Sequence, residues 1–194
     1  TFNQLSPNDP LIFSVRTFSK ILAPGLRVGW VETDPELQRL VINAKQAMDT
    51  CTNVPAQHLV AEFILRGGLD DHLNWLRAEY QSRRNAMLAS IDRHLGDRVR
   101  TTNPDGGFFL WVTLQGEDAK INSQRLFDIA LAEGVAFIPG PALSPTGRFA
   151  DAFRLCFASC TPERIEVGIE RLTNALDKAR AELSSGTAAS SGAR

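Results

Sequence analysis

The chain has 194 residues, 43% hydrophobic and 22% charged, with a formal net charge of −1. This composition is that of an ordinary soluble globular protein, with room for one large domain or one small domain plus part of another. The near-zero charge gives no electrostatic footprint for nucleic acid, and no basic run indicates a membrane surface. No apolar run is long enough to span a bilayer, and no signal peptide is visible. Three cysteines without zinc-site spacing fit a reducing compartment, so a cytoplasmic location is expected.

Hydrophobic periodicity and turn-forming residues predict alternating helices and strands, and hence an α/β protein. In chain order we expect strands at residues 11–18 and 26–31, a helix at 36–48, a break at 50–55 and a helix to about residue 65, a long helix at 69–95, strands at 98–102 and 107–114, a helix at 123–133, strands at 135–138 and 152–158, and a helix that begins at Pro162.

The two long helices carry the clearest signals. In residues 69–95 the apolar positions recur every three, four or seven residues, as on one face of an amphipathic helix. The last helix has Thr161 as its N-cap, Pro162 at its first position and Glu163 in its first turn. Its predicted core stripe is Ile165, Ile169, Leu172 and Leu176. The tail at 184–194 has nothing to bury and is expected to be disordered.

Residues 16–30 contain the most informative cluster of polar side chains. Two hydroxyls, Thr17 and Ser19, stand beside Lys20, and Arg27 follows a Pro-Gly turn. Hydroxyls and a guanidinium are the donors that a phosphate dianion needs, because arginine can give it two parallel charge-assisted hydrogen bonds. A lysine with apolar neighbours next to such a site favours the neutral amine, which can form a Schiff base with a carbonyl cofactor.

These fifteen residues resemble the lysine segment of class I/II aminotransferases, which use pyridoxal 5'-phosphate (PLP) and have fold type I. The resemblance implies that Lys20 binds PLP covalently and is the catalytic residue, while Thr17, Ser19 and Arg27 bind the cofactor phosphate. It implies no metal ion. A chance match of a surface loop is the alternative, against which the length of the matching register argues.

Two further segments resemble parts of the same family. Residues 104–111 resemble its Pro-x-Gly-Gly-x-Phe-x-Trp segment, although a plain turn before a hydrophobic strand remains an alternative. Residues 134–140 resemble its loop on the substrate side. Here Leu143 stands where many members have phenylalanine, which leaves the side-chain selectivity open.

Arg154 lies in the middle of an otherwise apolar strand. If residues 152–158 are extended, Phe153, Leu155 and Phe157 face one side, and Arg154 lies on the other. An arginine in such surroundings is costly unless paired, so a buried carboxylate partner is one explanation. The resemblance to the family's Arg-Leu-x-Phe strand implies the other, a bidentate grip on the substrate carboxylate.

The resemblance also implies the organisation of the chain. Residues 1–74 correspond to the end of the large PLP-binding domain, and 75–183 to the long interdomain helix and small C-terminal domain. The lysine comes early and the family's ring-contacting tyrosine is missing, so we expect a fragment that is by itself an incompetent enzyme. Residues 1–70 are expected to be poorly soluble alone, whereas 75–182 could fold alone.

For the intact protein, the resemblance implies transamination between an amino acid and a 2-oxo acid. The subgroup that it suggests contains 2-aminoadipate and aromatic aminotransferases, and a homodimer is expected. One alternative is the effector domain of a transcription regulator of the MocR/GntR type, which has the same fold behind a DNA-binding domain. A non-catalytic remnant is the third possibility.

Overall fold

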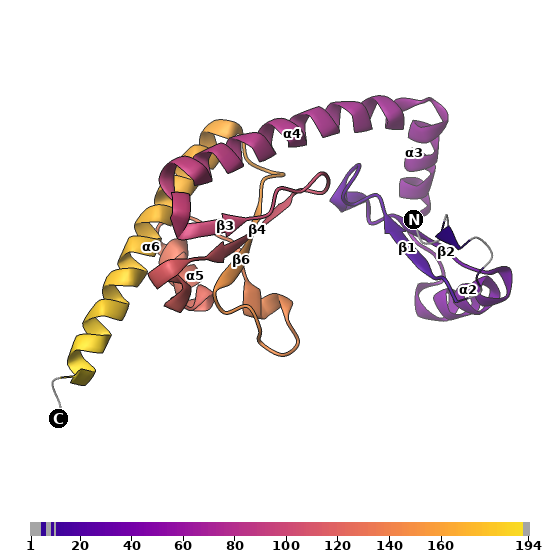
Figure 1. The fold of residues 1–194 in the computed structure, drawn as a ribbon. Coiled ribbons are helices and arrows are strands. Elements are labelled where there is room, and N and C mark those ends of the chain that lie inside the picture. Colours follow the sequence, from indigo (N-terminus) through magenta and orange to yellow (C-terminus); the bar gives the residue numbers. More distant parts are fainter. Residues whose placement is uncertain (1–4, 7–8, 10, 192–194) are drawn as a thin grey trace. The chain divides into compact units, whose positions relative to one another are not determined.

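The computed structural model describes residues 5–6, 9 and 11–191 (Figure 1). The chain divides into two compact units, Thr1–Arg77 and Ala78–Arg194, which are described separately. Helix α4 (Gly68–His94) begins in the first unit and ends in the second. No helix in the described ranges combines the length and the apolar character that a bilayer crossing requires. Assigning the units to a large and a small domain remains a prediction.

The first unit contains a short β-hairpin. Strands β1 (Ser14–Thr17) and β2 (Gly29–Glu32) pair antiparallel, with Ser14 opposite Glu32 and Thr17 opposite Gly29. The 3-10 helix η1 (Pro24–Leu26) lies between them. Both strands were predicted to be longer. Pairing ends at Thr17 because the chain then turns, and the amides of Leu22 and Ala23 both donate to the carbonyl oxygen of Phe18.

Two helices follow the hairpin, as predicted. Helix α2 (Pro35–Asp49) is capped by Asp34, whose carboxylate accepts from the amide of Glu36. Helix α3 (Val54–Leu65) is capped by Asn53, whose side chain accepts from the amide of Ala56. Gly67 ends this segment with a φ of +76°, a conformation that glycine adopts without steric cost.

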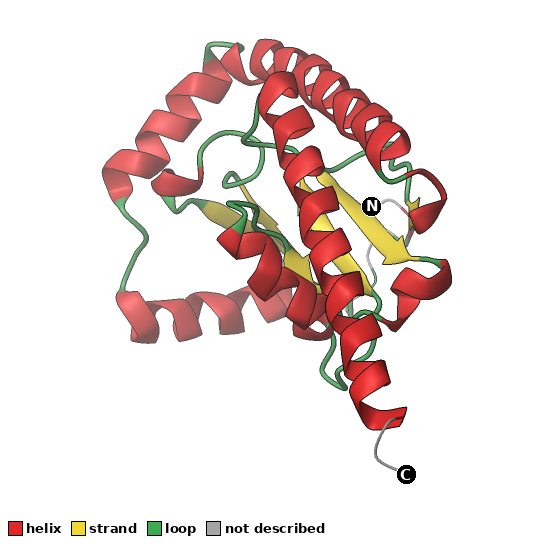
Figure 2. Ribbon diagram, turned by 90° about the vertical axis from the view of Figure 1, so that its left-hand side faces the viewer, coloured by secondary structure: helices red, strands yellow, loops and turns green. Residues whose placement is uncertain are grey.

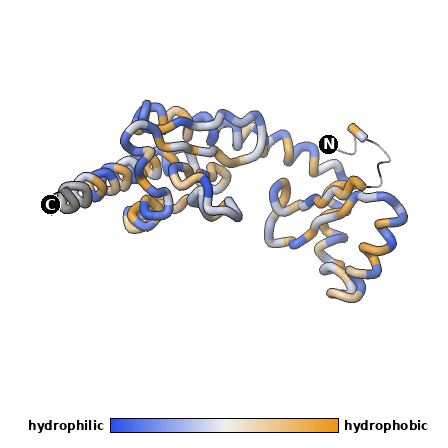
Figure 3. The backbone as a smooth tube through the Cα atoms, turned by 60° about the horizontal axis from the view of Figure 1, so that its bottom comes forward, coloured by the Kyte–Doolittle hydropathy of each residue, from blue (hydrophilic) through white to orange (hydrophobic). Residues whose placement is uncertain are grey.

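The first unit buries little apolar surface. Val28 and Val60 are its only buried hydrophobic side chains among the described residues. Leu11 is 88% exposed and Leu65 81% exposed, and the orange segments of Figure 3 mark many further apolar residues in this unit. Exposed apolar surface on this scale needs a covering partner. The prediction of poor solubility for residues 1–70 depends on this feature and stays a prediction.

The second unit is built on a four-stranded sheet with the order β3-β4-β6-β5, in which every neighbouring pair is antiparallel. Helices pack against the sheet, and in Figure 2 the helix that ends at the C-terminus lies across the strands. Its elements are η2 (Gly96–Arg98), β3 (Val99–Thr101), β4 (Phe109–Leu114), η3 (Gly116–Lys120), α5 (Ser123–Ala132), β5 (Ile138–Pro139), η4 (Gly140–Leu143), β6 (Ala152–Cys156) and α6 (Pro162–Ser191).

Buried side chains that alternate with less buried ones along the two central strands form the core of this unit. One face of β4 and β6 is buried, and it packs with one stripe of α4 and one of α6. The α6 stripe predicted from the sequence is buried at all four positions. The strand and helix members of this core are Leu110, Val112, Leu114, Phe153, Leu155, Met87, Ile91, Leu95, Ile165, Ile169, Leu172 and Leu176. Each such side chain contributes about 1.5–3 kcal/mol by leaving water.

The strand predicted at residues 135–138 is placed differently. Gly134 has a φ of +81°, its amide donates to Leu131, and the amide of Val135 donates to Ala130. These bonds close the end of α5, so Val135 belongs to the helix terminus and not to the sheet. Pairing with β6 begins only at Ile138, which lies opposite Arg154.

The tail also differs from its prediction. Helix α6 continues to Ser191, whereas disorder was expected from residue 184 onward. At the start of this stretch the Ser184 hydroxyl donates to the Arg180 carbonyl, and the Ser185 hydroxyl donates to the Glu182 carbonyl. The helix therefore extends without burying side chains at Ser184 and Ser185. Residues 192–194 lie outside the described residues.

Ion pairs flank the buried stripe of α6. Arg98 donates through Nε to Asp118 and through a terminal nitrogen to Asp177, both at 2.7 Å. The Asp118 side chain is only 2% exposed, so its charge depends on these donors. Further pairs that join α6 to neighbouring elements are Arg93–Glu166, His94–Glu166, Arg125–Glu182, Lys178–Glu133 and the longer pair Arg180–Asp118.

Replacing Arg98 tests whether the buried carboxylate of Asp118 needs this cation for the protein to be stable. Arg98→Met should lower the free energy of unfolding by about 3 kcal/mol, because Asp118 stays buried without its main cation. Arg125→Met is the matched control, since its pair with Glu182 lies in solvent, and it should change stability little. Urea denaturation of both variants measures the difference. Equal, small effects would contradict the assigned role of Arg98.

The stability contributed by Glu166 should depend on pH. Hydrogen bonds from His94 and Arg93 lower the pKa of Glu166 from 4.5 to about 2. Because the folded-state pKa is depressed, the contribution is complete above pH 4.5 and is lost as the pH falls through 2.

Glu166→Gln should therefore lower the melting temperature at pH 7, and the gap to the parent protein should shrink between pH 4.5 and 2. Thermal melts at several pH values measure this gap. Glu170→Gln is the control for removing one negative charge, because Glu170 has no ion-pair partner within residues 11–191. A gap for Glu166→Gln that stays constant over this range would refute the linkage.

Candidate functional site

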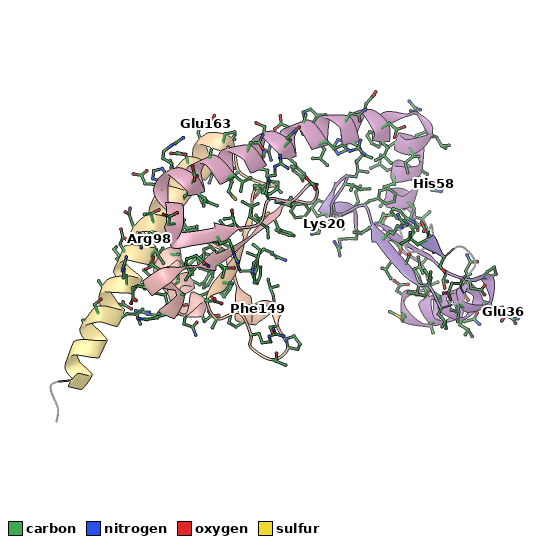
Figure 4. All side chains as sticks on the ribbon, viewed as in Figure 1. Lys20, Glu36, His58, Arg98, Phe149 and Glu163 are labelled. Carbon is green, nitrogen blue, oxygen red and sulfur yellow. The ribbon has the colours of Figure 1, made fainter. Side chains whose placement is uncertain are left out.

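Lys20 lies in the tight turn that follows β1 and is labelled in Figure 4. The amide of Phe18 donates to the Val28 carbonyl at 3.0 Å, which extends the hairpin by one bond before the chain turns. The amide of Leu22 then donates to the Phe18 carbonyl at 2.8 Å and closes the turn around the lysine. Local backbone bonding therefore fixes where the lysine leaves the hairpin.

Three polar residues of the same turn gather into one cluster. The Thr17 hydroxyl oxygen accepts from the amide of Ser19 at 3.0 Å. The Arg27 guanidinium donates to the Ser19 hydroxyl at 3.5 Å and to the Pro24 carbonyl at 3.0 Å. Arg27 has a φ of +54°, a left-handed conformation that is unusual for a residue with a side chain. The turn thus holds two hydroxyls and a guanidinium together, as the sequence predicted.

This cluster fits a phosphate dianion. No carboxylate pairs with Arg27 within the described ranges, so its positive charge has no internal counterion. Hydroxyls can donate to phosphate oxygens, and a guanidinium supplies charge-assisted bonds. Strain at Arg27 fits a site where the side-chain direction matters more than backbone preference.

The surroundings of Lys20 differ from the expectation. Its apolar neighbours, Phe18, Ile21 and Leu22, are only half-buried, and Lys20 itself is exposed. The reason is the small core of the first unit, which gives the turn little to pack against. The ring of Phe18 contacts Trp30, with centroids 4.7 Å apart, and this is the main apolar contact that anchors the turn.

Arg154 lies on the less buried face of β6, as the alternation predicted. Its strand neighbours Phe153 and Leu155 are 1% and 5% exposed and point into the core. Across the sheet, Arg154 stands opposite Trp111 on β4 and Ile138 on β5. The arginine is therefore held in the interior of the sheet by strands on both sides.

The guanidinium of Arg154 has no carboxylate partner in the part of the chain that the structure describes. Its Nε atom is buried and makes no hydrogen bond. Cζ lies 3.9 Å from the centroid of the Phe109 ring, a cation–π contact. A buried donor of this kind carries a desolvation cost that an arriving acceptor would remove. The structural explanation by a buried ion pair is therefore not supported within the described residues.

Two glycines and the single tyrosine have structural roles in the second unit. Gly107 has a φ of +79°, which favours glycine in the turn before β4. A Cβ on Gly140 would lie 2.2 Å from the carbonyl oxygen of Phe149, so this position also excludes a side chain. Tyr80 packs beside Phe108 and Phe157, and it therefore serves the core.

The predicted site residues fall into two groups, one in each unit. Thr17, Ser19, Lys20 and Arg27 occur together in one turn of the first unit, and Arg154 belongs to the second. Sequence reasoning assigned no role to Phe109, although it lies against Arg154. Phe109 is the phenylalanine of the family-like segment at 104–111, but its contact with Arg154 could not be read from the chain, because that contact depends on the pairing register of strands that are far apart in sequence.

Comparison with known proteins identifies the family. The model of "Aminotransferase class I and II" matches residues 3–172. The chain is 38% identical over 161 residues to aromatic-amino-acid aminotransferase 1 of Thermococcus litoralis, covering 82% of this chain and 38% of that protein. It is 30% identical over 160 residues to YisV, an uncharacterized HTH-type transcriptional regulator of Bacillus subtilis, covering 82% of this chain and 32% of the regulator.

A solved structure of an aminotransferase also matches this chain. LysN, the alpha-aminoadipate aminotransferase of Thermus thermophilus, complexed with N-(5'-phosphopyridoxyl)-L-leucine, superposes with a TM-score of 0.84 at 34% identity, covering 93% of this chain and 45% of that one. The chain thus spans about two fifths of the length of the aminotransferases that it matches. The α/β fold is accordingly part of a fold-type I structure, and the chain belongs to the class I and II aminotransferase family.

Proposed function

We propose that this chain is the lysine-bearing part of a PLP-dependent aminotransferase, which transfers an amino group between an amino acid and a 2-oxo acid. The observation that carries the proposal is the single turn that gathers two hydroxyls beside Lys20 with Arg27, a guanidinium that has no carboxylate partner in the described ranges. Family membership supports it, because aminotransferases of this class use PLP. Both kinds of group needed to hold this cofactor, phosphate donors and an amine, are present.

Different residues of the turn would hold different parts of the cofactor. Thr17, Ser19 and Arg27 would hold its phosphate, with the guanidinium supplying the charge-assisted bonds. Lys20 would bind its aldehyde carbon covalently. When bound, PLP supplies an electron-withdrawing ring that makes the Cα–H of the substrate acidic.

Two side chains would then act on the substrate. Freed by the incoming amino acid, the Lys20 amine would take the proton from substrate Cα and return a proton in the second half of the reaction. The Arg154 guanidinium would bind the α-carboxylate through two parallel hydrogen bonds, which orients the Cα–H bond. That no carboxylate among the described residues pairs with it supports this role.

The relatives suggest the substrate class. One is named for aromatic amino acids and another for alpha-aminoadipate, so we assign the parent protein to this subgroup. Small amino acids and 2-oxo acids would be its partners, without nucleic acid or membrane at this segment. A homodimer in the cytoplasm is the proposed form of the intact protein.

A regulator is the second candidate, because a transcription regulator matches most of this chain at 30% identity. In that reading the same turn would bind PLP for ligand sensing, behind a DNA-binding domain. Steady turnover of an amino acid with a 2-oxo acid favours the enzyme. Cofactor binding without turnover, together with a DNA-binding segment in the same gene, favours the regulator.

Reduction with borohydride should identify the cofactor lysine. In the full-length protein loaded with PLP, a pyridoxyl group should be fixed on Lys20, because this amine stands beside the phosphate donors. Peptide mass mapping locates the label. Lys20→Arg should abolish it, whereas Lys45→Arg, which changes a lysine paired with Asp49, should leave it in place. A label on Lys45, Lys120 or Lys178 would end the assignment.

Arg154→Lys should weaken amino-acid binding, because lysine lacks the planar fork that grips both carboxylate oxygens. Loss of a charge-assisted bond, about 2–3 kcal/mol, predicts a rise in KM of roughly 30- to 160-fold. PLP binding, followed by absorbance, should change little. Arg100→Lys is the control, since it is an exposed arginine on β3 of the same sheet. An unchanged KM with lowered stability would mark Arg154 as structural.

A further inference from the structure

Arg154 has one notable contact, the aromatic ring of Phe109. Phe109 is the first residue of β4 and pairs with Cys156, two positions along β6 from Arg154. Residues related in this way are diagonal neighbours on the same face of a sheet. The contact is therefore a product of the β4–β6 register, and it brings the ring centroid within 3.9 Å of Cζ.

The contact does not satisfy the hydrogen-bonding groups of the guanidinium. The Cζ atom of Arg154 lies over the ring of Phe109, whose π electrons attract the cation. The nitrogen atoms point outward in the plane of the group, and Nε is buried without an acceptor. The aromatic ring thus contacts the cation, while the buried Nε atom still has no acceptor among the described residues.

Trp111 does not provide this support, although it stands directly opposite Arg154. Its ring packs edge-on against Phe149, with centroids 5.6 Å apart. Among the residues that the structure describes, the recorded cation–π partner of Arg154 is Phe109. Of the two aromatic residues on this face of β4, Phe109 therefore contacts the guanidinium, whereas Trp111 packs on Phe149.

Phe109 is itself anchored to the core. Its ring lies 4.3 Å from that of Phe108, which in turn packs beside Tyr80, and Tyr80 packs edge-on against Phe157. Phe157 is 1% exposed. A series of aromatic contacts therefore connects the buried core to the guanidinium of Arg154.

We propose that Phe109 is a positioning residue for the α-carboxylate of the substrate: its ring holds the plane of Arg154 so that both donor nitrogens face the carboxylate. The proposal rests on the function proposed above and adds to it a residue that acts only through Arg154. Arginine has a long, flexible side chain, so fixing its plane before the substrate arrives reduces the entropy lost on binding.

Replacing the ring tests the proposal in the full-length, PLP-loaded protein. Phe109→Leu should lower kcat/KM roughly three- to thirtyfold, the range of a cation–π contact, with most of the change in KM. Phe109→Tyr keeps the π face and should restore KM, and Phe109→Met removes the face while keeping most of the volume. Phe127→Leu is the matched control, because this half-buried ring packs on Phe137 away from Arg154.

A double-mutant cycle separates positioning from packing. Phe109→Leu is made with and without Arg154→Gln, and affinity is measured by calorimetry for a 2-oxo acid and for a carboxylate analogue that lacks the amino group. The ring change should weaken binding in the presence of Arg154 and by less than about twofold without it. Equal losses in both backgrounds, or no loss in either, would overturn the proposal.

The role proposed for Arg154 and the role proposed for Phe109 are tested by different variants. If Arg154→Gln alone leaves the affinity for carboxylates unchanged, the proposed function of Arg154 is wrong and the role of Phe109 falls with it. If Arg154→Gln weakens binding while Phe109→Leu and Phe109→Met do not, only the positioning role is wrong. Melting temperatures of all variants show whether a change in affinity reflects loss of folding.

Discussion

Burial of one face of β4 and β6 is the constraint on which the second unit depends. Strand geometry sends successive side chains to opposite faces, so placing Leu110, Val112, Phe153 and Leu155 in the core dictates the direction of every other side chain in both strands. The helices α4 and α6 close that core from one side. A slip of one residue in the register would exchange the two faces.

The same constraint produces the candidate substrate site. Arg154 stands between two core residues and must point away from the core, toward the face that it shares with Phe109 and Trp111. Its cost in a sheet interior is offset only in part by the aromatic ring against it. Among the described residues no carboxylate pairs with this guanidinium, and the packing of the core keeps it on the opposite face of the strand.

In the first unit, the backbone has the corresponding role. Hairpin pairing, the turn around Phe18 and the left-handed Arg27 together bring the hydroxyls and the guanidinium into one cluster. The two candidate sites are therefore positioned by different means. The one in the second unit depends on the alternation of a strand, and the one in the first unit depends on a strained turn.

Much of this architecture could be predicted from the sequence because its signals are local. Periodicity revealed α4 and α6, caps and prolines marked helix starts, and alternation placed Arg154 opposite the core. The cluster of Thr17, Ser19 and Arg27 could be predicted because these residues are close in sequence and a Pro-Gly turn precedes Arg27.

Non-local features could not be predicted in this way. The start of β5 depends on how α5 closes at Gly134, and the exposure of Lys20 depends on how little the first unit buries. The contact of Phe109 with Arg154 depends on a register between strands that are separated by most of the second unit. Each of these is decided by packing between segments that are distant in the chain.

The charged rim of α6 has a consequence for the uniqueness of the fold. Its apolar stripe repeats every three or four residues, so a shift of the helix by one turn would still bury one apolar residue under another. The same shift would separate Glu166 from Arg93, Asp177 from Arg98 and Glu182 from Arg125. Surface charges of this kind add little energy one by one. Together they discriminate against the shifted arrangements that hydrophobic burial alone would accept, so they select a single alignment of the helix on the sheet.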